Sequence, residues 1–372
     1  MQWSNRAMLR LLTANTLVEV KEMKEGYKLL GDYIRQVDIR NTEGKEDNLL
    51  GVSVQKQFIP SIANTVGTDF TKYKVVKKGQ FTYIPDTSRR GDKIGIALLQ
   101  DYEEGLVSNV YTVFEVIDTE KLLPEYLMLW FSRPEFDRYA RFKSHGSVRE
   151  VMDWDEMCKV ELPVPAIEEQ RNIVKAYKTI TDRIALKKQI NDNLEETLAA
   201  VFTETFSTTD ATERTKLSEL MTFGNGKSRP KTNGNIPVYG GNGVLSYTDQ
   251  YNIENAILIG RVGAYCGSVY LEQGICWVSD NAIFAKSKVS TDEFFDYFLL
   301  KRLNLFSHHV GTGQQLLTQE ILNNIEVTKP DIDQIEVFNA NAKTVFQTIT
   351  ANRKEIIRLQ ELSTLLLSRL AG

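Results

Sequence analysis

The sequence is poor in the residues and motifs on which most enzyme sites are built. Its 372 residues include only three histidines and three cysteines, with no C-x-x-C pair and no H-E-x-x-H, so neither a disulfide framework nor a zinc site is expected. The stretch GNGKS at 224–228 lacks the first glycine of a phosphate-binding loop, because position 221 is Met221. Neither a G-x-G-x-x-G after a strand nor the N/D-P-P-Y/F of amino-methyltransferases occurs. These absences argue against a stand-alone enzyme on DNA, such as a fused methyltransferase.

Long hydrophobic runs and a strong net charge are also missing. No run approaches eighteen apolar residues, so no membrane span is expected, and the N-terminal stretch is too interrupted by polar residues for a signal peptide. We expect a cytoplasmic protein in which residues 5–24 form a short helix or a leader. The net charge of −4 counts against a protein held on nucleic acid by its overall charge, but it leaves room for local basic patches.

The sequence contains a long internal repeat. GSVREVMDWDEMCKVELPVP at 146–165 aligns without a gap with GTGQQLLTQEILNNIEVTKP at 311–330, an offset of 165 residues. Few positions are identical, but the apolar pattern and the final proline agree. Self-similarity over this distance indicates two related domains and not a solenoid.

Two kinds of segment alternate along the chain. Residues 27–160 and 209–325 carry short strand-like runs between turn residues, and each includes a helix, at 124–142 and 293–306. The helices that follow have apolar residues at alternating steps of three and four. The predicted order is an N-terminal segment, a first domain, a long helix, a second domain and a second long helix, at 1–26, 27–160, 161–208, 209–325 and 326–372.

The two long helices are expected to pack on each other. A single helix cannot bury an apolar seam alone, and two related helices in one chain pair most simply as an antiparallel coiled coil. The predicted seam consists of Ile173, Tyr177, Ile180, Ile184, Leu194, Leu198, Val201, Phe338, Val345, Ile349, Ile356, Leu359 and Leu366. Polar residues occupy its centre, with Lys187 and Asn191 in one helix and Asn352 at the place equivalent to Lys187. They either fix the register of the pair or are solvated at a loose crossing.

Several stretches resemble a known family. ILIGRVGAYCGSV followed by CWVSDNAIFA, and FTYIPDTSRRGDKIG followed by GLVSNVYTVF, are similar to two forms of the target-recognition domain in specificity subunits of type I restriction–modification systems. VELPVPAIEEQRNIV resembles the junction where such a domain enters the conserved helix. The second junction, KPDIDQIEVF, departs from the usual P-x-x-E-Q form. The resemblance covers residues 27–372 and implies an α+β fold with two mixed α/β recognition domains, two long antiparallel coiled-coil helices and a pseudo-twofold internal repeat.

The resemblance also implies a non-catalytic DNA reader without a cofactor or metal of its own, and it implies partners. Each recognition domain of such a subunit reads one half of a split site on double-stranded DNA, and the paired helices set the unread spacer. The helices dock two modification subunits, which carry S-adenosylmethionine and methylate adenine, and restriction subunits complete the nuclease. The alternative interpretation is a coiled-coil adaptor that binds only protein partners.

Candidate DNA contacts lie in polar loops, because arginine pairs with guanine and amide side chains pair with adenine. In the first domain they are Tyr83, Arg89, Arg90, Lys93, Asn109, His145, Ser147 and Arg149. In the second domain they are Lys227, Arg229, Tyr239, Asn242, Tyr247, Arg261, Thr312, Gln314 and Gln315. For any one of them, a solvated loop charge or a core tyrosine is as good an interpretation as a DNA contact.

Overall fold

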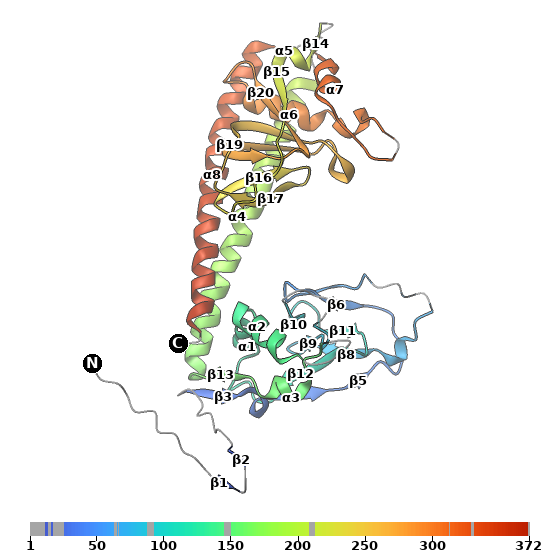
Figure 1. Cartoon of the computed structure of the whole chain (residues 1–372), viewed down its shortest axis with the longest axis vertical. Helices are drawn as coiled ribbons and strands as arrows, with labels where there is room; N and C mark the ends of the chain where they lie inside the picture. Colours follow the sequence, from blue (N-terminus) through green and yellow to red (C-terminus); the bar gives the residue numbers. More distant parts are fainter. Residues whose placement is uncertain are drawn as a thin grey trace, which may run out of the picture. The chain divides into compact units, whose positions relative to one another are not determined.

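A computed structural model of the chain divides it into two compact units (Figure 1). The first unit comprises residues 1–184 and 357–372, and the second comprises residues 185–356. The structure describes residues 12–13, 16–17, 26–62, 65, 67–87, 93–144, 150–207, 213–311, 313–328 and 331–370. No helix among these residues is both long enough and apolar enough to cross a membrane.

The first unit is built from short antiparallel strands and three short helices. Its strands are β3 (Tyr27–Leu29), β4 (Ile34–Val37), β5 (Ile39–Arg40), β6 (Leu50–Val52), β7 (Phe58–Pro60), β8 (Lys74–Lys77), β9 (Phe81–Tyr83), β10 (Ile96–Leu98), β11 (Glu104–Val107), β12 (Thr112–Val116) and β13 (Glu161–Pro163). They form a four-stranded sheet in the order β10-β9-β12-β4, a three-stranded sheet β11-β8-β5, and the pairs β6–β7 and β13–β3. Its helices are α1 (Pro124–Phe131), α2 (Pro134–Lys143) and α3 (Trp154–Cys158), with 3-10 turns η1 (Leu30–Asp32) and η2 (Phe70–Lys72).

The second unit contains a larger sheet. Its strands are β14 (Arg214–Lys216), β15 (Met221–Asn225), β16 (Ile236–Gly240), β17 (Gly243–Thr248), β18 (Ile253–Gly260), β19 (Val269–Val278), β20 (Ala282–Ser287) and β21 (Glu326–Thr328). The six-stranded sheet has the order β15-β20-β18-β19-β16-β17, and β14 pairs with β21. The helices are α5 (Leu217–Leu220), α6 (Glu293–Arg302) and α7 (Gln319–Asn324), with 3-10 turns η3 (Gly263–Tyr265) and η4 (Leu305–His308).

The internal repeat is visible in the strand order. The order β4-β12-β9-β10 in the first unit corresponds to β15-β20-β18-β19 in the second, and all of these pairs are antiparallel. The outer pairs β3–β13 and β14–β21 also correspond, since Leu162 and Val327 differ by 165 positions and both lie at the centre of such a pair. The sequence repeat is therefore a repeat of one mixed α/β domain.

The predicted helix at 124–142 is divided into α1 and α2. Pro134 occupies the first turn of α2, and α1 ends at Phe131. Proline lacks an N–H and disfavours the helical conformation of the residue before it, so one continuous helix cannot form there. The N-terminal prediction also needs a correction, because β1 (Leu12–Thr13) and β2 (Thr16–Leu17) pair antiparallel and are not helical. The rest of 5–24 lies outside the described residues.

The long helices α4 (Ile167–Ser207) and α8 (Ile332–Arg369) are antiparallel where they pair in the second unit (Figure 1). Phe202 lies near the C-terminal end of α4 and contacts Phe338 near the start of α8, with ring centroids 5.3 Å apart. In the first unit, the N-terminal part of α4 and the last turn of α8 both pack on the domain core, through Ile173 and Leu367 among others.

The predicted seam needs one correction. Leu198, Phe338, Ile349 and Ile356 are buried, but Val201 is 42% exposed and the neighbouring Phe202 is 1% exposed. The buried residues near this end of α4 recur every four positions, at 198, 202 and 206. A helix of 3.6 residues per turn drifts away from a strict heptad stripe, and here it follows the core of the second domain.

The remaining seam positions are half-buried. They are Ile173, Tyr177, Ile180, Ile184, Leu194, Val345, Leu359 and Leu366. The polar residues at the centre pair across the helices: Lys187 Nζ donates to Asn352 Oδ1 at 2.8 Å, and Asn352 Nδ2 donates to Asn191 Oδ1 at 2.9 Å. The interpretation of a loose, solvated crossing is therefore wrong.

Gly267 holds the loop after η3 in a conformation that only glycine adopts easily. Its φ is +86°, and a Cβ atom there would lie 2.6 Å from the backbone nitrogen of Phe306. We expect Gly267→Ala to lower the free energy of unfolding by about 2–4 kcal/mol, because strain and a backbone clash add. Urea denaturation measures this. Gly313→Ala is the control, since no atom lies within 4 Å of its Cβ position, and an equal effect of both changes would contradict the argument.

Asp296 in α6 gives the second unit a dependence on pH. Burial raises the pKa of Asp296 from 3.8 to about 7, with Ser287 opposing the shift and Asp292 adding to it. Because the pKa of Asp296 is higher in the folded state than in the unfolded state, protonation of Asp296 stabilises the fold. This stabilisation is complete below the unfolded-state pKa and is lost as the pH rises through 7. Replacing Asp296 with asparagine should therefore raise the melting temperature more at pH 8 than at pH 5. Parallel pH profiles for the two proteins would show that Asp296 does not titrate in this way.

Candidate nucleic-acid interface

In the first domain, the loop that follows strand β9 is held by two backbone hydrogen bonds and a β-bridge, an arrangement that we call a clasp. The N–H of Met152 donates to the carbonyl of Pro85 at 3.0 Å, and the N–H of Thr87 donates to the carbonyl of Glu150 at 2.9 Å. Asp86 forms an antiparallel bridge with Val151 between them. Residues 85–87, which lead into the predicted DNA contacts Arg89 and Arg90, are therefore held against residues 150–152.

The second domain repeats this clasp. The N–H of Leu317 donates to the carbonyl of Arg261 at 2.9 Å, and the N–H of Gly263 donates to the carbonyl of Gln315 at 3.1 Å. Val262 forms an antiparallel bridge with Leu316. Residues 315–317 lie 165 positions after residues 150–152, so the two clasps occupy equivalent places in the repeat. Both domains therefore present the loop after their central strand in the same way.

Further loops meet at this edge of the second domain. The N–H of Lys227 donates to Val278 O at 2.9 Å, Ser279 N–H donates to Tyr239 O at 2.8 Å, and Arg261 N–H donates to Asn281 O at 3.0 Å. A Cβ on Gly241 would lie 3.6 Å from both Asn281 O and Val262 O, which places the β16–β17 turn beside them. The edge, which we call the loop edge, consists of residues 226–229, 240–243, 260–263, 279–281 and 313–317.

The loop edge carries an excess of positive charge. Its charged residues are Lys227, Arg229 and Arg261 against Asp280, a net charge of +2 by this count. Within the described part of the chain, none of the three cations forms an ion pair. Unpaired surface cations in adjacent loops are the groups that attract a phosphate backbone, although the whole chain is acidic.

Arg261 is the most constrained of these cations. Its carbonyl accepts hydrogen bonds from Leu317 N–H and from Cys266 Sγ at 3.4 Å, in addition to the bond that its own N–H donates. Its Nε is shielded from solvent and has no hydrogen-bond partner among the described residues. A fixed backbone and an unused guanidinium donor suit a residue that binds an acceptor supplied by a ligand, such as a guanine edge or a phosphate.

Other predicted residues at or near this edge are accessible. Asn242, Tyr247 and Gln314 are exposed and Gln315 is half-buried, while Lys93 and Asn109 of the first domain are exposed on separate loops. The predicted residues Arg89, Arg90, His145, Ser147, Arg149 and Thr312 lie outside the described residues.

Two predicted tyrosines are not available for base contacts. Tyr83 is 0% exposed and belongs to the core of the first domain, where burial raises its pKa to about 12. Tyr239 is nearly buried, and its hydroxyl donates to Glu272 Oε2 at 2.9 Å. Their strand positions place the rings in the sheet interior, because alternate residues of a strand point to opposite faces.

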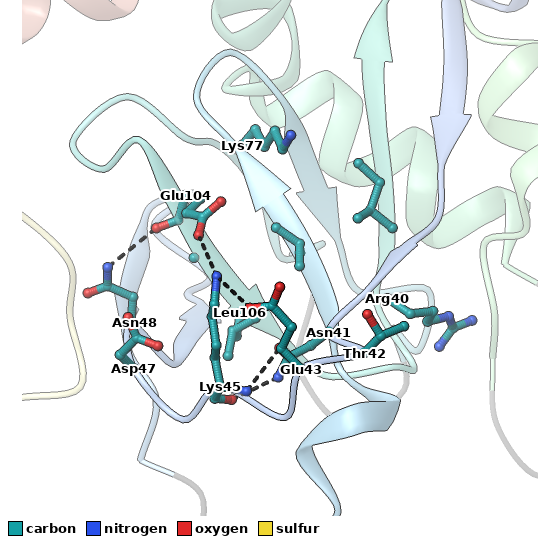
Figure 2. Close-up of a pocket in the computed structure, with 13 residues that line it drawn as sticks. Arg40, Asn41, Thr42, Glu43, Lys45, Asp47, Asn48, Lys77, Glu104 and Leu106 are labelled. Carbon is teal, nitrogen blue, oxygen red and sulfur yellow. Dashed lines mark hydrogen bonds and ion pairs between the residues drawn. The ribbon is translucent and has the colours of Figure 1, made fainter.

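A pocket on the three-stranded sheet of the first domain does not have the chemistry of a phosphate site (Figure 2). Its volume is about 180 Å³, and its charged lining is balanced, with three cations, Arg40, Lys45 and Lys77, against Glu43, Asp47 and Glu104. The Lys45 ammonium lies 3.2 Å from Glu43 and 3.9 Å from Glu104, so carboxylates of the pocket itself neutralise its charge. Among the described residues, no group of three or more His, Cys, Asp or Glu side chains could hold a metal ion.

Comparisons with known proteins agree with this architecture. The sequence profile described as type I restriction modification DNA specificity domain matches residues 16–196 and 210–360, one match for each repeat. The crystal structure of a type I restriction–modification S subunit from M. genitalium aligns over 93% of this chain and 96% of that one, at 14% identity and a TM-score of 0.57. At this identity the structural likeness shows the fold alone.

Two curated relatives have similar names. The specificity subunit of the type I restriction enzyme EcoprrI from Escherichia coli is 25% identical over 33% of this chain. That of the HindI enzyme from Haemophilus influenzae is 25% identical over 48% of this chain. The alignments span only 31% and 39% of these two relatives. Because the family profile matches both repeats and covers most of the sequence, the chain belongs to the type I restriction modification DNA specificity domain family.

Proposed function

We propose that this chain is the non-catalytic specificity subunit of a type I restriction–modification enzyme. Each repeated domain reads one half of a bipartite site on double-stranded DNA. The observation that carries the proposal is the pair of equivalent clasps, Pro85–Met152 and Arg261–Leu317, which give one chain two matched loop supports. Two readers in one chain fit a split target better than a single continuous one.

The long helices set the distance between the two half-sites in this proposal. They contain 41 and 38 residues, which corresponds to about 57–62 Å at 1.5 Å per residue, compared with about 34–36 Å for one turn of DNA. Each domain is fastened to a long helix by a buried amide. Gln170 of α4 accepts from Leu123 N–H, and Asn339 of α8 accepts from Phe295 N–H, both at 2.9 Å. Such fixed attachments suit a spacer of defined length.

The chain works with partners in the cytoplasm. Two modification subunits carry S-adenosylmethionine and methylate adenine, and restriction subunits join them. An apolar stripe on α4 in the second unit supports protein docking: Leu186, Ile190 and Val201 are 57%, 38% and 42% exposed and fall within about 60° of the helix circumference. We assign this stripe to a helix of the modification subunit, since apolar helix faces pair with one another.

Charged substitutions in the stripe should prevent assembly. We expect Leu186→Lys combined with Ile190→Lys to abolish co-purification of the modification subunit, because two desolvated ammonium groups would oppose docking. Gln189→Lys, on an exposed neighbouring position, adds the same charge outside the stripe and serves as the control. Full recovery of the complex with the double substitution would show that docking occurs elsewhere.

A methylome tests the function itself. The chain is expressed with its neighbouring modification subunit in a host without DNA methylation, and modified adenines are read by long-read sequencing. We expect one split motif with a fixed unread gap. A well-formed complex that leaves no motif would contradict the proposal and favour the coiled-coil adaptor.

A further inference from the structure

The central contact between α4 and α8 joins equivalent positions of the repeat. Lys187 and Asn352 are 165 residues apart, the offset of the sequence repeat, and the Lys187 ammonium donates to the Asn352 side chain at 2.8 Å. Each repeat therefore meets its own counterpart at this crossing. If two copies of the same helix paired in this way, identical residues would face each other here.

The crossing is polar within an apolar seam. Lys187 Nζ also lies 2.8 Å from Glu355 Oε2, and the Lys187 side chain is only 16% exposed. Asn191 and Asn352 are both 9% exposed and are hydrogen bonded to each other. Leu198 of α4 and Ile349 of α8 are buried on the side toward the second domain. Polar side chains in such a seam are costly unless they find their partners.

The two helices contribute different charges to the crossing. The counterpart of Glu355 in α4 is Ile190, and the counterpart of Asn191 in α8 is Ile356. In the contact between Lys187 and Glu355, α4 supplies the ammonium and α8 supplies the carboxylate. Pairing α4 with the α4 of another molecule would bring two lysines together without a carboxylate. Pairing α8 with another α8 would leave each Glu355 beside an Asn352, without the Lys187 ammonium that it meets in the natural pair. Partly buried charges that lose their partners are strongly destabilising.

We infer that the crossing selects the partner of each long helix: α4 accepts α8 and rejects the α4 of a second copy of this chain. The selection rests on two features. The charges of α4 and α8 are complementary at the crossing, and two copies of the same helix cannot form the same hydrogen bonds there. It does not rest on DNA recognition. If the proposed function holds, its consequence is that one complex contains one domain of each kind and not two copies of the same reader.

Exchanging the crossing residues in the full-length chain tests this selection. The α4-type variant gives both helices the α4 residues, through Asn352→Lys, Glu355→Ile and Ile356→Asn. The α8-type variant gives both helices the α8 residues, through Lys187→Asn, Ile190→Glu and Asn191→Ile. The swapped variant carries all six substitutions and rebuilds the natural pairing with the two helices exchanged.

Thermal unfolding of the four proteins, without DNA or partners, is the measurement. Both like-with-like variants should melt about 5 °C or more below the natural chain, and the swapped variant should melt within about 2 °C of it. If the like-with-like variants fail to fold, recovery of a folded swapped protein supports the selection equally. A swapped variant no more stable than the like-with-like ones, or like-with-like variants that match the natural chain, would overturn it. Either of these results would leave the DNA-specificity proposal standing.

Discussion

Arg261→Ala should reduce methylation at the cognate site by about 10- to 100-fold in a complex that still assembles. A bidentate arginine–guanine pair contributes about 1–3 kcal/mol of discrimination, or about 5- to 150-fold, and the expected loss lies within this range. Arg261 is the residue to change because its backbone is held by Asn281 and Leu317 and its Nε lacks a partner among the described residues. The measurement is the rate of adenine methylation on an oligonucleotide that contains the natural motif.

Two further variants separate base reading from general charge. Arg261→Lys keeps the cation but loses the planar pair of donors, so we expect relaxed specificity at one base pair and weaker methylation. Lys288→Ala removes an exposed cation outside the loop edge and should leave both motif and rate unchanged. If Arg261→Ala preserved the motif and the rate, Arg261 would have only a structural role.

Removing one heptad from both long helices should shorten the unread spacer by about three base pairs. Seven residues correspond to about 10 Å of helix, and base pairs are spaced about 3.4 Å apart. The deletions are residues 178–184 and residues 357–363, which spare the crossing of Lys187 with Asn352. Both helices must be shortened, because each domain packs on segments of both α4 and α8.

The methylome reports the result directly. The two half-sites should stay the same, and only the gap should change. Removing residues 178–184 alone is the control, and it should lower stability without giving a new uniform gap, since the paired segments would no longer match. An unchanged spacer in the double deletion would disprove the role of the helices as a ruler.

The sequence by itself determined the alternation of domains and long helices. Hydrophobic periodicity is local, so steps of three and four residues indicated two helices in the regions where α4 and α8 lie. The 165-residue offset related the segments that became the two clasps, and it aligned Lys187 with Asn352 before any contact was known. The break before Pro134 was also readable in principle, because proline acts on its immediate neighbours.

Only the tertiary structure decided which side chains share a surface. Tyr83 and Tyr239 were reasonable loop candidates, but the sheet buries both, whereas Arg261 is brought beside Leu317, 56 positions away. Val201 and Phe202 could not be distinguished by a heptad count, because the core of the second domain determines which one is covered. The same holds for Lys187, whose ammonium is neutralised by Glu355 from the other long helix. These outcomes depend on contacts between residues far apart in the chain, and local sequence patterns do not encode such contacts.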